Sequence, residues 1–326
     1  MYNSEMYKLG SHRSVIRELF EFGKKRMAEV GADKVYDFSL GNPNVPAPEC
    51  VKKAVLDLVS MPDSTVLHGY TSAQGDAAVR KAIADSINRR FGADVTPDLI
   101  YMTCGAAASL TITLNALNEG SDEFILLAPF FPEYSVFVKA AGGTSVIVPF
   151  DKKDFQPDFD AFEKAVTART KAVIVNSPNN PSGTVYSEET IGRMCDLLKA
   201  KSEEFGHPIV IIADEPYREL VYGDVKVPYI MNMYADTVVC YSYSKSLSLP
   251  GERIGYIAVS PRLTDAQGLY AAICGAGRAL GYVCAPSMFQ KVAAACVDAV
   301  PDIEAYARNR DLIYNSLTEM GYDCVR

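Results

Sequence analysis

The chain has 326 residues, of which 48% are hydrophobic and 22% are charged, and its formal net charge is −8. These proportions exclude a disordered or fibrous protein, and the length favours one large domain with a smaller one over a single core. The negative charge and the lack of long Lys/Arg runs argue against a nucleic-acid partner.

Targeting signals and metal motifs are also missing from the sequence. The segment Met1–Arg13 is polar, and no apolar run reaches the roughly 18 residues of a membrane span. The eight cysteines include no C-x-x-C pair, and no histidine stands at the spacing of a metal site. We therefore expect a cytoplasmic protein with reduced thiols, no metal and no membrane partner.

The first predicted elements are a helix from Ser14 to Val30 and an irregular connector, Gly41–Pro48, whose turn formers indicate a domain boundary. From about residue 97, short β-branched runs alternate with segments of helical period, which predicts an α/β fold with a mostly parallel sheet between helices. Ligands of such folds bind at the carboxyl ends of the strands. The expected strands are residues 99–103, 124–128, 144–149, 171–176, 209–213, 237–241 and 254–259, and the expected helices include 106–118, one that opens at Ser187, and 303–320.

Three segments that follow strands carry candidate site residues. Thr103–Ser109 begins a helix, whose free backbone N–H groups and dipole suit an anion, although its alanines are also simply good helix formers. Asn176–Gly183 is dense in Pro and Gly and predicts a rigid turn. Asp214 ends a strand that looks buried, where an isolated aspartate most often caps a turn.

The fourth segment, Ser242–Gly255, holds the strongest signal. Lys245 stands among small hydroxyl residues just after an apolar strand, and Arg253 follows eight residues later. This pattern suits a lysine that binds a carbonyl cofactor covalently beside an arginine that binds its phosphate. A lysine on a surface loop is the alternative interpretation of Lys245 alone.

In order and spacing, these segments resemble the class I/II aminotransferases, which are pyridoxal 5′-phosphate (PLP) enzymes of fold type I in the aspartate aminotransferase-like superfamily. The resemblance covers residues from roughly 40 to 255. It implies an N-terminal segment, residues 1–45, that contributes to a small domain, and a large PLP-binding domain, residues 46–290. Residues 291–326 would begin a C-terminal α/β small domain that looks truncated.

The resemblance also implies a role for each candidate residue. Lys245 would hold PLP and act as the catalytic acid and base, and Asp214 would pair with the pyridine nitrogen. Tyr217 and Asn180 would bind the 3-oxygen of the ring. The phosphate would be bound by Gly105, Ala106, Ala107, Ser242 and Arg253, and Phe131 would stack on the pyridine ring.

Three further matches concern assembly and substrate. Tyr70, in the segment Gly69–Gly75, resembles the family's tyrosine that reaches the phosphate of a neighbouring subunit, which implies a homodimer. Gly41, together with Asn180, would approach the substrate. No residue matches the family's arginine for the substrate α-carboxylate. Arg278 stands where some relatives read a distal carboxylate, although a surface arginine explains it equally well.

The sequence therefore predicts a PLP-dependent aminotransferase that moves an amino group between an L-amino acid and a 2-oxo acid. One alternative is a PLP-dependent C–S β-lyase such as a cystathionine β-lyase, because the two kinds of enzyme share the cofactor site. Another is a PLP-binding regulatory module, which would need a DNA-binding domain ahead of the connector. The amino donor and acceptor stay open.

Overall fold

A computed structural model describes residues 1–11, 15–152 and 154–324. The chain divides into two compact units, residues 1–44 and 45–326. The N-terminal unit contains α1 (Ser4–Ser11), α2 (Val15–Val30) and a short 3-10 helix, η1 (Ala32–Lys34). The predicted N-terminal helix is confirmed from residue 15 onward, while its first residue, Ser14, lies outside the described residues.

The second unit is built on a seven-stranded sheet within the described residues. The spatial order is β1-β7-β6-β5-β4-β2-β3, and only β7 runs against its neighbours, so the predicted mostly parallel sheet is confirmed. Each expected strand is present with its ends shifted by a residue or so. The strands are β1 (Ile100–Thr103), β2 (Glu123–Leu127), β3 (Thr144–Val148), β4 (Thr170–Asn176), β5 (Val210–Asp214), β6 (Thr237–Ser242) and β7 (Gly255–Val259).

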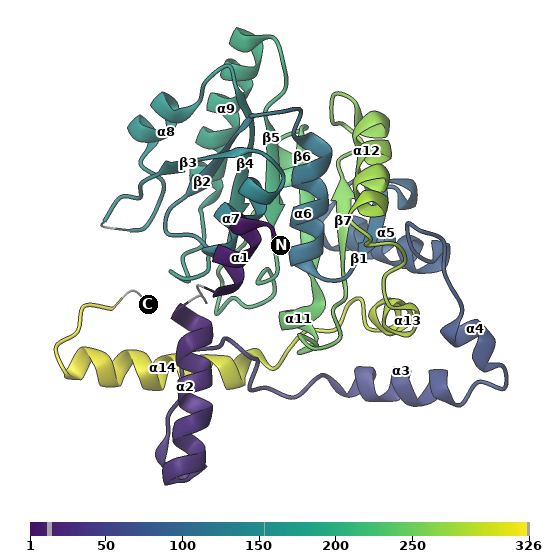
Figure 1. The fold of residues 1–326 in the computed structure, drawn as a ribbon, viewed down its shortest axis with the longest axis vertical. Helices are drawn as coiled ribbons and strands as arrows, with labels where there is room; N and C mark the ends of the chain where they lie inside the picture. The colour runs from purple at the N-terminus through teal and green to yellow at the C-terminus, as the bar shows by residue number, and fades with distance from the viewer. Residues whose placement is uncertain (12–14, 153, 325–326) are drawn as a thin grey trace. The chain divides into compact units, whose positions relative to one another are not determined.

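Helices cover both faces of this sheet (Figure 1). Their bounds are α3 (Glu49–Val59), α4 (Ser64–His68), α5 (Ala77–Phe91), η2 (Pro97–Leu99), α6 (Ala106–Leu117), α7 (Glu133–Ala140), α8 (Phe159–Ala165), α9 (Glu188–Phe205), α10 (Ile230–Met233), α11 (Tyr243–Ser246), α12 (Ala266–Ala279), α13 (Ser287–Ala295) and α14 (Ile303–Glu319). The predicted start of α9 is confirmed, because the Ser187 side chain accepts a hydrogen bond from the Thr190 N–H. None of the helices in the described part of the chain is long and apolar enough to cross a membrane.

The two faces of the sheet hold separate hydrophobic cores. Successive side chains of a strand point to opposite faces, so Ile211 and Ala213 of β5 join one core while Val210 and Ile212 join the other. The first core also takes residues from α3, α5, α9 and α13, and the second from α6, α7 and α12. Figure 1 shows α6 and α12 side by side along the β6–β7 half of the sheet. Both faces of every central strand are buried, which explains their nearly continuous apolar sequences.

The antiparallel β7 brings distant segments together at the edge of the sheet that is formed by the carboxyl ends of the parallel strands. Its first residue, Gly255, pairs with Thr103 on one side and with Ser242 on the other. A Cβ atom at Gly255 would lie 2.2 Å from the carbonyl oxygen of Tyr241 and 3.1 Å from the Cα atom of Gly105. Only glycine allows this approach, and it places the ends of β1 and β6 beside the start of β7.

Candidate active site

Most of the predicted site residues lie along this same edge of the sheet. β1, β4, β5 and β6 run in one direction, so their carboxyl ends carry Gly105, Asn180, Asp214 and Ser242 to the same side. Because β7 starts where those strands end, Arg253 arrives there as well. Sites in open α/β sheets form at this edge.

Asp214 is the most enclosed charged group of the site. Its side chain is only 4% exposed, and the Tyr134 phenol donates a hydrogen bond to its Oδ2 atom. Its Oδ1 atom is buried and has no hydrogen-bond partner among the described residues. The pKa of Asp214 is raised to about 7, chiefly by burial; the bond from Tyr134 opposes the rise, and the charge of Glu215 adds a smaller upward effect. The carboxyl group therefore lacks one partner that would stabilise its ionised form.

The turn after β4 is fixed by its own asparagines. Asn176 donates to the carbonyl oxygen of Asp214 at 2.9 Å, and its Oδ1 accepts from the N–H of Asn180 at 2.7 Å. Asn179 accepts from both the N–H and the hydroxyl of Ser182, at 3.0 and 2.8 Å, and donates to the carbonyl oxygen of Pro129 at 3.1 Å. This network holds the half-buried Asn180 next to the segment that carries Phe131.

Lys245 and Tyr217 lie together beyond the ends of β6 and β5. The Nζ atom of Lys245, on the short helix α11, is 5.8 Å from the centroid of the Tyr217 ring. Burial lowers the pKa of Lys245, which increases the neutral fraction of its amine at neutral pH. Burial, with a smaller effect of the Asp214 charge, raises the pKa of Tyr217 to about 12. The site thus contains an amine suited to nucleophilic attack and to proton transfer.

A cradle for a small anion lies at the β1–β7–β6 end of the edge. Gly105, at φ +87°, precedes α6 with no side-chain cap, so the first N–H groups of that helix lack helical partners. A Cβ atom at Gly105 would lie 3.1 Å from Nη2 of Arg253, whose Nη1 donates to the carbonyl oxygen of Pro250 at 2.8 Å. The hydroxyls of Ser242 and Ser244 are 2.7 Å apart. The arginine charge and the helix N-terminus both favour an anion here.

Other predicted residues are placed differently. Phe131 contacts Tyr134 edge to face, with ring centroids 5.7 Å apart, and so lies near Asp214 through that tyrosine. Tyr70 is 99% exposed in the single chain, and Arg278 is exposed on α12. Gly41 belongs to the N-terminal unit, and its predicted contact with substrate stays a prediction.

Sequence reasoning missed Tyr134, Asn176 and Ser244 as members of the site. Tyr134 offered one signal, because it stands three residues after Phe131, at the start of a helix that follows a strand. Asn176 and Ser244 lie inside the segments Asn176–Gly183 and Ser242–Gly255, but the sequence gives no sign of their hydrogen-bond partners. Glu215, the residue after Asp214, does not join the site and pairs with Arg218 instead.

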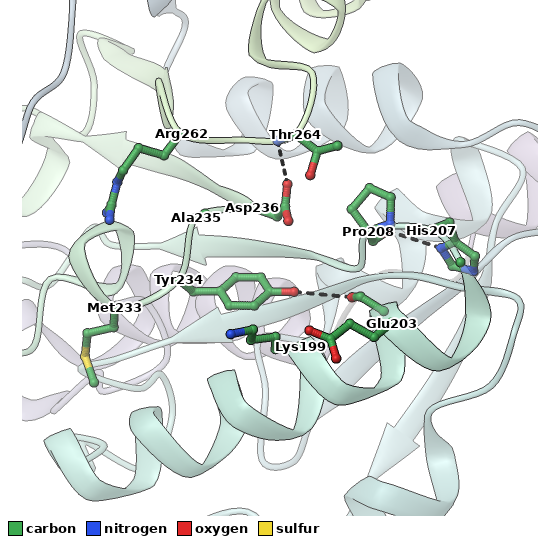
Figure 2. A pocket seen from close by; sticks show the side chains of 12 residues that line it. Lys199, Glu203, His207, Pro208, Met233, Tyr234, Ala235, Asp236, Arg262 and Thr264 are labelled. Atoms are coloured by element: carbon green, nitrogen blue, oxygen red, sulfur yellow. Dashed lines mark hydrogen bonds between the residues drawn. The ribbon is translucent and has the colours of Figure 1, made fainter.

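Two cavities of the second unit lie outside this group of site residues. One, of about 530 Å³, is at the opposite edge of the sheet, where Pro208 precedes β5 and Asp236 precedes β6 (Figure 2). Tyr234 lines it and donates to the carbonyl oxygen of Ile209 at 2.8 Å. The other, of about 970 Å³, lies between α14 and the segments 182–185 and 220–225. Only this second cavity borders the turn that holds Asn180.

Comparisons with known proteins agree on one family. A family model described as aminotransferase class I and II matches residues 33–326. A protein of Bacillus subtilis named putative aminotransferase YugH is 32% identical over 78% of this chain, and an aspartate aminotransferase of Thermotoga maritima is 32% identical over 74%. The matches span 66% and 62% of those two relatives, which is less than two thirds of their length.

Solved structures match over more of the chain. An aminotransferase from Eubacterium rectale has a TM-score of 0.96 and 60% identity, over 99% of this chain and 82% of that one. An aspartate aminotransferase from Thermus thermophilus with maleate has a TM-score of 0.82 and 25% identity, over 97% of this chain and 80% of that one. The fold and the sequence therefore point to the same group of proteins.

Proposed function

The chain belongs to the class I and II aminotransferases, and from this premise we propose that it binds PLP and transfers an amino group from an L-amino acid to a 2-oxo acid. The observation that carries the proposal is the buried, unpartnered Oδ1 atom of Asp214 at the edge of the sheet that also carries Lys245. The names of the relatives reported above favour transfer over the elimination catalysed by a β-lyase.

The residues present fit PLP at three points. A protonated pyridine nitrogen would supply the N–H donor that Oδ1 of Asp214 lacks, and it would lower the pKa that burial now raises. The anion cradle suits a phosphate, because Arg253 offers a fork of donors. Lys245 supplies an amine for covalent attachment. The residues that we propose to hold PLP are Gly105, Ala106, Ala107, Phe131, Asn180, Asp214, Tyr217, Ser242, Lys245 and Arg253, with Tyr70 contributed to a second copy.

When bound, PLP supplies an electron sink that weakens the bonds at the α-carbon of an attached amino acid. Asp214 keeps the ring nitrogen protonated, which maintains that electron withdrawal. Once the amino group of the substrate had replaced Lys245 on the cofactor, the freed amine, whose lowered pKa favours the neutral form, would take a proton from the substrate α-carbon and then donate it at the cofactor end of the same C–N bond. The cradle around Arg253 holds the phosphate, so that the reacting carbon stays within reach of Lys245.

Assembly and domain layout follow from the same proposal. We propose a homodimer in which Tyr70, 99% exposed in one chain, reaches the phosphate of its partner. Residues 46–290 would form the PLP-binding body, with residues 1–45 and 291–326 contributing to a smaller domain. The relatives reported above that are named aspartate aminotransferases make aspartate the first amino donor to test.

The test is the visible absorption spectrum of the purified protein titrated with PLP. We expect a band from the lysine-bound cofactor that is lost in Lys245→Ala and kept in Lys81→Ala, which changes an exposed lysine of α5. Amino acids added without a 2-oxo acid should convert the band to the pyridoxamine form. Release of pyruvate and ammonia would instead support the lyase, and a folded protein without any band would contradict the proposal.

A further inference from the structure

A buried ion pair begins at Glu215, the residue that follows Asp214 in the chain. Glu215 is 2% exposed and Arg218 is 5% exposed. The Nε atom of Arg218 donates to Oε2 of Glu215 at 2.6 Å, and its Nη2 donates to Oε1. The same guanidinium donates to the carbonyl oxygens of Val227 and Pro228, each at 3.0 Å. Four hydrogen bonds therefore fix one planar group.

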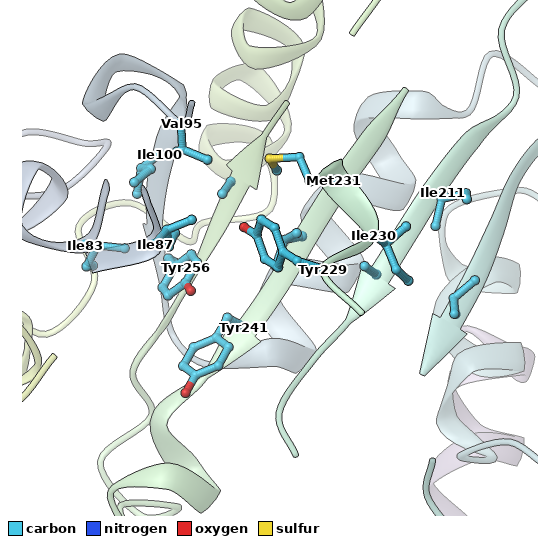
Figure 3. Close-up of a cluster of buried hydrophobic side chains, with 14 of the residues drawn as sticks. Ile83, Ile87, Val95, Ile100, Ile211, Tyr229, Ile230, Met231, Tyr241 and Tyr256 are labelled. Atoms are coloured by element: carbon cyan, nitrogen blue, oxygen red, sulfur yellow. The ribbon is translucent and has the colours of Figure 1, made fainter. Parts of the chain in front are cut away.

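The surroundings of this pair are aromatic. The Arg218 guanidinium lies 5.0 Å from the ring centroids of both Phe91 and Tyr229. Tyr229 and Tyr241 belong to the buried cluster drawn in Figure 3. Burial raises the pKa of Glu215, and the Arg218 guanidinium opposes that rise. Taking both charges out of water is costly, and a hydrophobic pair of similar volume often stabilises a protein as well or better. Stability alone is therefore a weak explanation of the pair.

The position of the pair in the chain suggests its role. Asp214 and Glu215 are successive residues at the end of β5, so their side chains point to opposite faces of the sheet. The N–H of Glu215 still pairs with the carbonyl oxygen of Cys240 on β6, at 2.9 Å. In the sequence, Tyr217 stands between Glu215 and Arg218. The ion pair therefore holds this turn on one face of the sheet. On the opposite face, the same turn presents Asp214 and Tyr217 to the site.

From this geometry we infer that Arg218 is a positioning residue for the proposed function, which holds the 214–218 turn through Glu215 so that Asp214 meets the pyridine nitrogen of PLP. An arginine suits this task because its fork fixes direction as well as distance. Lysine at the same position could not bond both carboxylate oxygens and both carbonyls in one plane.

The test measures PLP affinity by absorbance titration in a double-mutant cycle. Arg218→Met is expected to weaken PLP binding by roughly 5- to 150-fold, and Arg218→Lys by less. In an Asp214→Asn background, Arg218→Met should add little further loss, because the effect acts through Asp214. In an Arg253→Met background the two losses of PLP affinity should multiply, because the anion cradle contacts PLP separately from Asp214. Arg169→Met is the control away from the site, because it removes a more exposed arginine from buried Glu123 at the opposite ends of the strands.

A second readout separates positioning from simple stabilisation. With PLP labelled by nitrogen-15 in the ring, NMR of the saturated wild-type protein should show a protonated nitrogen, and Arg218→Met at saturation should show a reduced protonated fraction. Losses that multiply in both backgrounds, or an unchanged protonated fraction, would overturn the inference. If Arg218→Met does not fold, Arg218→Lys carries the same cycle. A wild-type protein that binds no PLP would overturn the proposed function itself, which is a distinct result.

Discussion

The phenol of Tyr134, on α7, donates a hydrogen bond to one oxygen of the Asp214 carboxylate, while the other oxygen has no partner within the described chain. The bonded oxygen fixes the orientation of the carboxylate. The open oxygen is consequently held toward the space where we propose that the pyridine nitrogen binds. Asp214 is positioned from two sides, by Tyr134 on its own face of the sheet and by the Glu215–Arg218 pair on the other.

Tyr134→Phe should therefore weaken PLP binding without unfolding the protein. A hydrogen bond to a charged group contributes about 1.5–3 kcal/mol, so the dissociation constant should rise by roughly 10- to 150-fold. Tyr234→Phe is the control, because it removes another buried phenol's hydrogen bond, to Ile209, at the opposite edge of the sheet. Equal affinities for PLP in the two variants would contradict the role given to Tyr134.

The stability of the PLP-free protein should depend on the titration of Asp214. Its pKa is about 7 in the folded chain, above the ordinary 3.8, so the folded state holds the proton more tightly than the unfolded state does. The unfolding free energy should then fall as the pH rises from about 4 to 7, by an amount on the order of 4 kcal/mol.

Urea unfolding of the wild type and of Asp214→Asn across this pH range isolates the effect from other groups. The stability of Asp214→Asn relative to the wild type should increase steadily with pH. A difference that stays constant from pH 4 to 7 would mean that Asp214 has an ordinary pKa.

Gly105→Ala should damage the anion cradle more than the fold. The residue has φ +87°, and the new Cβ atom would lie 3.1 Å from Nη2 of Arg253. Gly92→Ala is the control for a positive φ without a new contact, because Gly92 has φ +64° at the end of α5 with open space around it. Gly92→Ala should lose about 1–2 kcal/mol of stability, and Gly105→Ala should lose more, because a φ of +87° with a ψ of 174° is open essentially only to glycine. Urea unfolding measures both losses. Only Gly105→Ala should also bind PLP more weakly.

Gly255→Ala should be the most destabilising of the glycine substitutions considered. Its Cβ atom would meet backbone, 2.2 Å from the carbonyl oxygen of Tyr241, so β6 and β7 would have to separate. We expect a loss of about 3 kcal/mol or more, seen as a lower melting temperature. Gly251→Ala, four residues earlier and without a neighbour within 4 Å, should melt like the wild type. Similar melting of the two variants would contradict the close approach.

The sequence predicted the strands well because their apolar runs are short and are bounded by turn formers. It could not predict the direction of β7, since hydrophobic pattern gives the type of an element and not its partners. Local relationships can also be predicted from the sequence. Because successive side chains of a strand point to opposite faces, Asp214 and Glu215 are expected on different faces of the sheet. The Tyr134–Asp214 bond was not accessible, because it joins residues 80 positions apart and either side chain alone suggests an ordinary buried residue.

The antiparallel β7 also has a consequence for the order in which the site can be completed during synthesis. Among the described strands, β1 neighbours only β7, whereas β2 to β6 pair with one another. As the chain leaves the ribosome, β1 has no strand to pair with until residues 255–259 emerge, whereas Asp214 has both of its neighbouring strands once β6 has emerged. The Gly105 part of the anion cradle must therefore wait for Arg253, so the proposed phosphate contacts and Lys245 become available to the nascent chain at nearly the same moment.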